Sequence, residues 1–385
     1  MAVPARAQNA LAVPPPYHVV ASIGASHLDL VTVGRELARE RGMAEARDTL
    51  EGLVLLQDAS RGRFERDLVR AAHGAENAVP DSIGALPRSA AGGVARRDVV
   101  FLFVNGLGQK RESFCTTVLH DAVAHLRTQG FGAEILTTSP YAPSEVNGEV
   151  LLRQLKTSLA QEATRDVVIV AVSKGVHDLV QALGASAGHP SHELTAEELG
   201  KIRYVVSMSG VVRSSVVAGW LLDSNRLVAR LARSFMRVPL GDFPHLRGIE
   251  SLKHDPWEHI LSTGGVRGLR CVWLSFVVFP DGVDGQPKTG AFRSRLLRSL
   301  QGKSVDVGPY DGLTESASSL LPPGTGLEQW VVRVRGAHGI VHGKYLDGTP
   351  VVGKGRARGS AAQQIIDPLL RSLPIAPAGQ QTAAR

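Results

Sequence analysis

The sequence predicts an α/β fold, in which a mostly parallel β-sheet is flanked by helices. After about residue 96, short apolar runs alternate with amphipathic segments at intervals of about 30 residues, a spacing typical of strand–helix–strand units. The first of these runs, Val99 to Val104, is apolar throughout, as expected of a strand that is covered on both faces. With 385 residues, of which 43% are hydrophobic, the chain can bury a full core.

The individual elements follow from the spacing of the apolar residues. Strands are expected at 99–104, 133–137, 167–172, 202–208, 271–278 and 330–334. Helices are expected across 114–126, which Gly130 ends, and at 146–159 and 176–183, with two or three more between His27 and about Gly74.

Changes in composition indicate the domain boundaries. Residues 1–26 and 374–385 are expected to be disordered, because they lack an apolar pattern. Residues 27–96 are expected to form a helical N-terminal segment and a Pro- and Gly-containing linker, and we expect this segment to brace the body rather than to cover a site. The α/β domain then extends over 97–373, with a helical cap inserted at about 211–260.

Charge and hydropathy exclude several classes of protein. The net charge of +7 comes from basic residues scattered without a run of five or more, which argues against nucleic-acid binding. Apolar stretches fall well short of the roughly 18 residues that a membrane-spanning helix needs. We expect a soluble protein that is cytoplasmic rather than exported, although Ala5-Arg6-Ala7 resembles the cleavage site of a truncated export signal.

The cap and the cysteines each leave two interpretations. In the cap, Leu227, Val228, Leu231 and Phe235 form an apolar stripe that either packs on the body or acts as a lid touching a membrane surface. Cys115 and Cys271 are too few for a disulfide scaffold, and we expect two buried free thiols rather than one bridge.

The junction that follows the 167–172 strand is the most informative point for chemistry. Ser173 ends this strand, Gly175 follows two residues later, and a helix begins at once. A nucleophilic serine occupies such a strained strand-to-helix turn, where unpaired backbone N–H groups at the helix N-terminus can stabilise an oxyanion. The alternative is an ordinary serine that caps the helix.

A serine nucleophile needs a base and an orienting carboxylate, and for a serine on a strand-to-helix turn of this kind these are sought downstream in the order acid, histidine. Asp311 and His338 stand in loops after predicted strands, and Asp281, Asp284 and His342 compete for these two roles.

Backbone N–H groups for an oxyanion hole are expected from two loops. One is the Asn105-Gly106-Leu107-Gly108 loop, with Gly106 and Leu107 as the candidate donors. Lys174, directly after the serine, is expected to supply the other N–H group.

No motif indicates a cofactor or a metal. The Gly106-x-Gly108 pair lacks the third glycine of a dinucleotide fingerprint, and no phosphate-binding loop is present. The histidines do not have the His-Glu-x-x-His spacing of a zinc site.

Taken together, four motifs resemble the α/β-hydrolase superfamily, and in particular lipase- or esterase-like members with a Ser-Lys-Gly nucleophile elbow. The motifs are Val104-Asn105-Gly106, Ser144-Glu145-Val146-Asn147, Val172-Ser173-Lys174-Gly175 with Asp178, and Asp311-Gly312-Leu313 before Ala337-His338. The resemblance covers roughly residues 98–345 and departs from the family pattern at Ala171, where the elbow normally has glycine, and at Asn105 in the oxyanion loop.

The resemblance implies a serine hydrolase that cleaves a small-molecule or lipid carboxylic ester through an acyl-enzyme, without a cofactor. It implies Ser173 as the nucleophile, His338 as the general base and Asp311 as the orienting carboxylate. The N–H groups of Lys174 and of the loop near Leu107 would form the oxyanion hole. The alternative is a non-catalytic relative that keeps this fold as a binding or interaction module.

Overall fold

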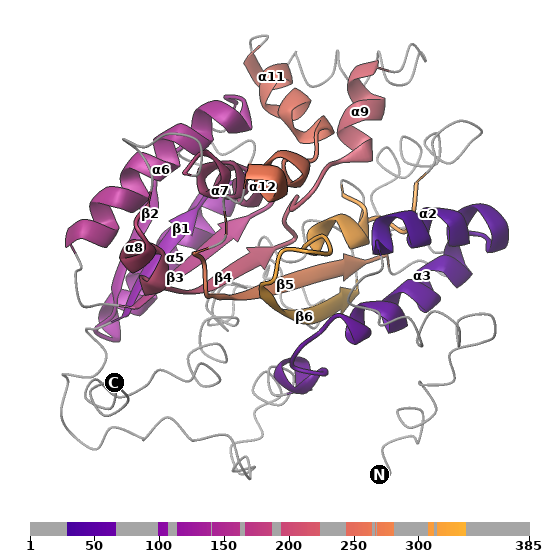
Figure 1. Cartoon of the computed structure of the whole chain (residues 1–385), viewed down its shortest axis with the longest axis horizontal. Coiled ribbons are helices and arrows are strands. Elements are labelled where there is room, and N and C mark those ends of the chain that lie inside the picture. The colour runs from indigo at the N-terminus through magenta and orange to yellow at the C-terminus, as the bar shows by residue number, and fades with distance from the viewer. Residues whose placement is uncertain are drawn as a thin grey trace, which may run out of the picture.

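The computed structural model describes residues 29–66, 99–106, 114–139, 141–161, 166–186, 194–223, 244–263, 266, 268–280, 307–311 and 314–335. Its centre is a six-stranded sheet (Figure 1). The strands are β1 (Val99–Val104), β2 (Gly132–Leu136), β3 (Asp166–Val172), β4 (Ile202–Met208), β5 (Val272–Phe279) and β6 (Glu328–Arg335). All six lie within two residues of the predicted strands, which confirms the predicted fold class.

The order of the strands determines where loops diverge. The order is β2-β1-β3-β4-β5-β6, and every neighbouring pair is parallel. From β1 the chain moves outward to β2 and then returns to form β3 on the other side of β1. The loops that leave the carboxyl ends of β1 and β3 therefore part in opposite directions, and such a switch point is where open parallel sheets bind ligands.

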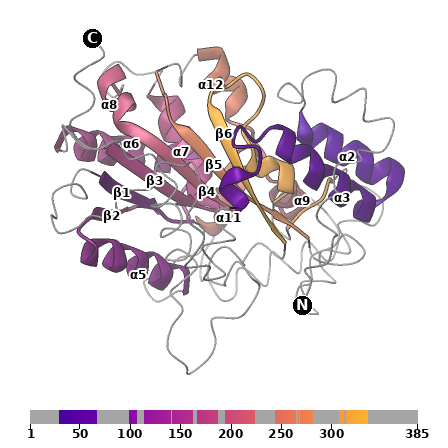
Figure 2. The same ribbon diagram turned by 90° about the horizontal axis from the view of Figure 1, so that it is seen from below.

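Helices cover both faces of the sheet (Figure 2). On one face, α5 (Phe114–Thr128) packs against apolar side chains of the strands. On the other face lie α6 (Ser144–Gln161) and α7 (Lys174–Ala185), whose buried residues form a second core with alternate residues of β1 and β3. The alternation explains why these strands are apolar at every position.

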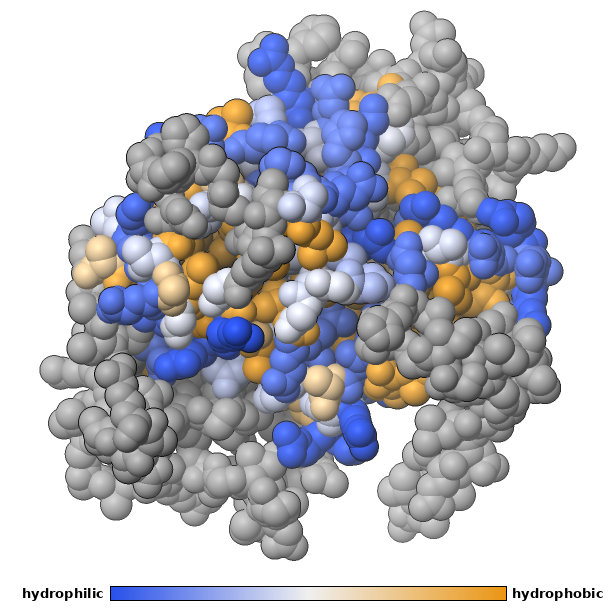
Figure 3. All heavy atoms as spheres, viewed as in Figure 1, coloured by the Kyte–Doolittle hydropathy of each residue, from blue (hydrophilic) through white to orange (hydrophobic). Residues whose placement is uncertain are grey.

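An N-terminal pair of helices packs against the far end of the sheet. It consists of α2 (Leu30–Arg41) and α3 (Met43–Leu53), followed by the 3₁₀ turn η3 (Val54–Leu56). Leu30, Leu50 and Leu53 share a buried cluster with Val277 of β5 and Val331 of β6. On the face seen in Figure 3, hydrophilic residues cover the outer side of these helices at the right-hand edge.

The segment after η3 covers the edge strand β6. The amide of Ala59 donates to the carbonyl of Gln329 (2.8 Å), and the carboxylate of Asp58 accepts from the amide of Val331 (3.2 Å). Glu65 accepts from the amide of Arg333 (3.0 Å) and also pairs with its guanidinium. An open strand edge is thereby blocked against pairing with another chain.

Further helices lie at 194–263. They are α8 (Ala196–Lys201), α9 (Val216–Asp223), α11 (Pro244–Glu250), the 3₁₀ turn η4 (Ser251–Lys253) and α12 (Trp257–Thr263). The predicted cap stripe from Leu227 to Phe235 lies outside the described residues, as do both predicted disordered ends and the linker. Within the described part of the chain, no helix is long and apolar enough to span a bilayer.

Candidate functional site

Ser173 has an unusual backbone conformation at the end of β3. Its φ of 53° and ψ of −122° are rare for a residue with a side chain, and such strain persists only where the surroundings enforce it. Its hydroxyl makes no capping hydrogen bond to α7, which argues against the alternative of an ordinary helix cap. Ser173 is the one partly exposed residue between positions 167 and 180, and all its neighbours in that range are buried.

The turn at Ser173 is held by the backbone on both sides. The Ser173 amide donates to the carbonyl of Met208 at the end of β4 (3.1 Å), and its carbonyl accepts from the amide of Val211 (3.2 Å). These bonds hold both peptide groups of Ser173, so the side chain is directed from a rigid element.

The loop after β1 lies directly against this turn. A Cβ atom placed on Gly106 would lie 3.1 Å from Cβ of Ser173, and one placed on Gly175 would lie 2.3 Å from the carbonyl oxygen of Asn105. Glycine at these two positions therefore permits the loops after β1 and β3 to touch. The structure brings together Gly106, Ser173 and Lys174, whereas Leu107 lies outside the described residues.

A buried ion pair stabilises the first turn of α7. The ammonium of Lys174 is 2.6 Å from Oδ1 of Asp178, and both side chains are at most 2% exposed. Asn147 of α6 donates to the other carboxylate oxygen (2.8 Å), and Ser144 also hydrogen-bonds to this carboxylate. Burial raises the pKa of Asp178, and the Lys174 ammonium opposes that effect. The motif residues Ser144, Asn147, Lys174 and Asp178 thus form one network, a role that the sequence alone did not assign.

His177 lies one turn along α7 and is fully buried. Burial and the charge of Lys174 lower its pKa to about 4, so the ring is neutral at neutral pH. A neutral, enclosed imidazole is part of the core of this region.

Asp311 lies in a buried loop that precedes β6. Its Oδ1 accepts from the amide of Thr314 (2.8 Å), and its own amide donates to the Thr314 carbonyl (3.0 Å). The hydroxyl of Ser316 donates to the carbonyl of Val278 (2.6 Å), which places the loop at the carboxyl end of β5. His338 and the competing residues Asp281, Asp284 and His342 lie outside the described residues, so the assignment of base and acid stays a prediction.

One segment links the loops of Ser173 and Asp311. The amide of Val211 donates to Ser173, and the amides of Val212 and Arg213 donate to the carbonyl of Ser318 (3.1 and 3.2 Å). Ser318 belongs to the 3₁₀ turn η5 (Ser316–Ser319), which directly follows the Asp311 loop. Both candidate residues are therefore tied to the same segment of backbone.

Among solved structures, the metagenomic carboxyl esterase MGS0156 aligns over 81% of this chain and 91% of its own, with 17% identity and a TM-score of 0.50. The chain has an α/β-hydrolase fold. The mature lipase BlEst2 of Bacillus licheniformis aligns over 64% of this chain and 86% of its own, with 17% identity and a TM-score of 0.40. No protein-family model matches the chain, and no curated protein matches it.

The fold of the chain accommodates alanine at position 171, where the sequence departs from the usual elbow glycine. This residue is fully buried and pairs with Val104 of β1 and Ser207 of β4. Its methyl group is part of the core that includes α6 and α7. The Ala171 methyl group therefore packs in this core behind the Ser173 turn.

Proposed function

We propose that this chain is a serine hydrolase that cleaves carboxylic esters through an acyl-enzyme on Ser173. The observation that carries the proposal is the strained backbone of Ser173 at the switch point of the sheet. That conformation holds Ser173, a partly exposed residue, at the N-terminus of α7 without using its side chain as a cap. A helix N-terminus favours negative charge, and charge develops on the carbonyl oxygen during acyl transfer.

In the proposed reaction, Oγ of Ser173 attacks the ester carbonyl while His338 takes its proton. Asp311 orients the imidazole and stabilises its protonated form. The N–H groups of Lys174 and of the loop at Gly106 and Leu107 bind the negative oxygen of the tetrahedral intermediate. The C–O bond to the alcohol then breaks as His338 returns the proton to it, and water hydrolyses the acyl-enzyme by the same steps.

The choice of esters as the substrate class has separate support. The solved protein of the same fold with a TM-score of 0.50 is described as a carboxyl esterase. Many chemistries occur on this fold, so the substrate must be tested directly.

Hydrolysis of p-nitrophenyl acetate, butyrate and octanoate tests the proposal. Ser173→Ala is expected to lower kcat by about 10³-fold or more, because the nucleophile is lost while binding remains. Ser209→Ala is the matched control, since Ser209 also ends a strand with a positive φ, of 44°, and its buried hydroxyl has no hydrogen-bond partner among the described residues. Ser209→Ala should retain wild-type activity.

Two results would contradict the proposal. Undiminished hydrolysis by Ser173→Ala would assign the activity to another residue. A folded wild-type chain that hydrolyses none of the three esters would favour the non-catalytic binding module.

A further inference from the structure

The loop that carries Asp311 is closed by its own hydrogen bonds and deeply buried. Tyr310 and Glu315 pair as an isolated antiparallel bridge around the Asp311 turn. Tyr310, Asp311, Thr314 and Glu315 are each at most 2% exposed. Any group that holds Glu315 therefore also holds the position of Asp311, four residues away across a single turn.

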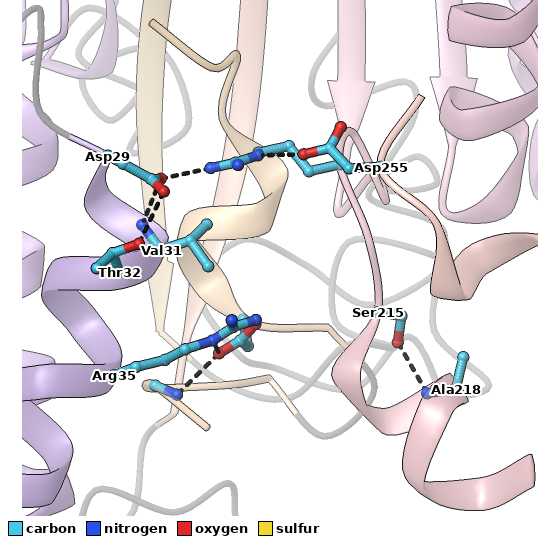
Figure 4. A network of polar contacts seen from close by, with 10 residues as sticks. Asp29, Val31, Thr32, Arg35, Ser215, Ala218 and Asp255 are labelled. Carbon is cyan, nitrogen blue, oxygen red and sulfur yellow. Dashed lines mark hydrogen bonds and ion pairs between the residues drawn. The ribbon is translucent and has the colours of Figure 1, made fainter. Parts of the chain in front are cut away.

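Glu315 is a buried carboxylate whose counter-charge comes from α2. Arg35 binds it in a bidentate manner, with Nε–Oε1 at 2.9 Å and Nη2–Oε2 at 2.6 Å (Figure 4). The amide of Gly308 also donates to Oε1 (2.8 Å). Paired hydrogen bonds between a guanidinium and a carboxylate fix orientation as well as distance.

The backbone of α2 touches the same loop. A Cβ atom on Gly308 would lie 3.1 Å from the carbonyl carbon of Gly34, and one on Gly34 would lie 3.5 Å from Cδ of Pro309. The backbone of α2 at Gly34 therefore lies directly against the start of the loop, next to the Arg35–Glu315 pair.

A second ion pair ties α2 to the segment beside Ser173. Arg213 binds Asp29, the N-cap residue of α2, and its Nε donates to Asp255 (2.7 Å) (Figure 4). Two residues earlier, Val211 donates to the carbonyl of Ser173. The N-terminal helix thus contacts elements that hold both Ser173 and Asp311.

We propose that Arg35 is a positioning residue for ester hydrolysis, because its ion pair with Glu315 holds the Asp311 loop in place. The inference rests on the proposed function, in which Asp311 orients His338. On this account the N-terminal helices support the active site. Loss of the Arg35 guanidinium leaves the Glu315 carboxylate buried without a counter-charge. The carboxylate then shifts toward solvent, and the Asp311 loop moves with it.

The effect of Arg35 should appear in kcat rather than in KM, because Asp311 does not touch the substrate. A shift of a positioned group by about 1 Å can cost about 100-fold in rate, so Arg35→Gln is expected to lower kcat by about 10- to 100-fold with KM nearly unchanged. The acid limb of the pH–rate profile should also move to lower pH, since a displaced carboxylate no longer favours the protonated imidazole. Arg35→Lys keeps the charge but loses the bidentate geometry, so its kcat should lie between those of the wild type and of Arg35→Gln.

The control for these variants is the substitution of a different partly exposed arginine, Arg203, by glutamine. Arg203 pairs with Asp166 at 2.7 Å at the amino ends of β3 and β4, away from both candidate loops. Arg203→Gln is expected to stay within about twofold of wild-type kcat, since exposed pairs contribute little. The steady-state constants for p-nitrophenyl butyrate and thermal unfolding are measured for each variant.

A double variant covers the possibility that Arg35→Gln fails to fold. Arg35→Gln with Glu315→Gln removes the uncompensated buried charge together with the ion pair. A folded double variant with lowered kcat and a shifted acid limb supports the inference, and one with wild-type kcat and pH profile overturns it.

Failure of this inference is distinguishable from failure of the proposed function. If Ser173→Ala and Asp311→Asn both abolish hydrolysis while Arg35→Gln behaves like Arg203→Gln, only the positioning role is wrong. If Ser173→Ala or Asp311→Asn leaves hydrolysis intact, the proposed triad fails, and the inference fails with it.

Discussion

Replacing Gly175 by alanine tests the close contact between the loops after β1 and β3. A Cβ atom at this position would lie 2.3 Å from the carbonyl oxygen and 2.8 Å from the carbonyl carbon of Asn105. Both are backbone atoms, so no side-chain rotation relieves the overlap. Ordinary contacts begin at 3.4 Å, and the Asn105 loop or the start of α7 must therefore move by about 1 Å.

The expected cost follows from that displacement. Overpacking of a well-packed core typically lowers the free energy of unfolding by about 1–3 kcal/mol. The same movement separates the proposed oxyanion donors near Gly106 from Ser173, and a misplacement of about 1 Å lowers the rate by about 100-fold. Gly175→Ala should therefore lose both stability and kcat.

Gly52→Ala is the matched control for this substitution. Gly52 lies in α3, and a Cβ atom there would meet nothing within 4 Å. Alanine in a helix is favoured over glycine, so this variant should gain up to about 1 kcal/mol. Urea unfolding and hydrolysis of p-nitrophenyl butyrate measure both variants. A Gly175→Ala chain as stable and as active as Gly52→Ala would refute the contact between the two loops.

Three further predictions concern buried groups near the site and in the core. Lys174→Met leaves the Asp178 carboxylate without its buried partner and should lower the free energy of unfolding by about 3–5 kcal/mol. The double variant Lys174→Met with Asp178→Leu should recover most of that lost stability. If urea unfolding shows that the losses of the two substitutions add, this expectation is contradicted. The folded His177 ring has a pKa of about 4, whereas the unfolded ring takes up a proton below about pH 6.5. The free energy of unfolding should therefore fall by about 3 kcal/mol as the pH drops from 6.5 to 4. His177→Asn should remove this part of the pH dependence of stability, and an unchanged pH dependence in the variant would exclude His177 as its source. Burial raises the pKa of Cys271 to about 12, so a disulfide reagent at pH 8 should modify this thiol only after unfolding. Rapid labelling of the peptide containing Cys271 in the native chain would contradict this expectation, because it would show that the thiol is accessible.

The strands were predictable because local sequence determines them. Buried parallel strands are apolar at every position, so 99–104 and 202–208 coincide with β1 and β4. The strand-to-helix turn at Ser173 was predictable for the same reason, since the strand, the serine, the glycine and the helix follow one another in sequence. The short helix α8 was missed, although its capping box of Thr195 and Glu198 was a readable signal.

Contacts between distant segments could not be predicted from one sequence. Arg35 and Glu315 are 280 residues apart, and neither stands in a pattern that names its partner. The same is true of Asp58 and Val331 at the sheet edge. Such pairs depend on the tertiary arrangement, in which α2 and α3 pack against β5 and β6. The expected bracing by the N-terminal helices stays a prediction, and the residues that make these contacts emerge only from the fold.

Covalent labelling tests whether Ser173 is an activated nucleophile. A fluorophosphonate probe reacts with serines activated by a base, and intact mass followed by peptide mapping locates the adduct. We expect one adduct per chain on the peptide containing Ser173, its loss in Ser173→Ala, and its retention in Ser209→Ala. An adduct that persists in Ser173→Ala, or a folded wild-type chain that takes up no probe, would contradict the account.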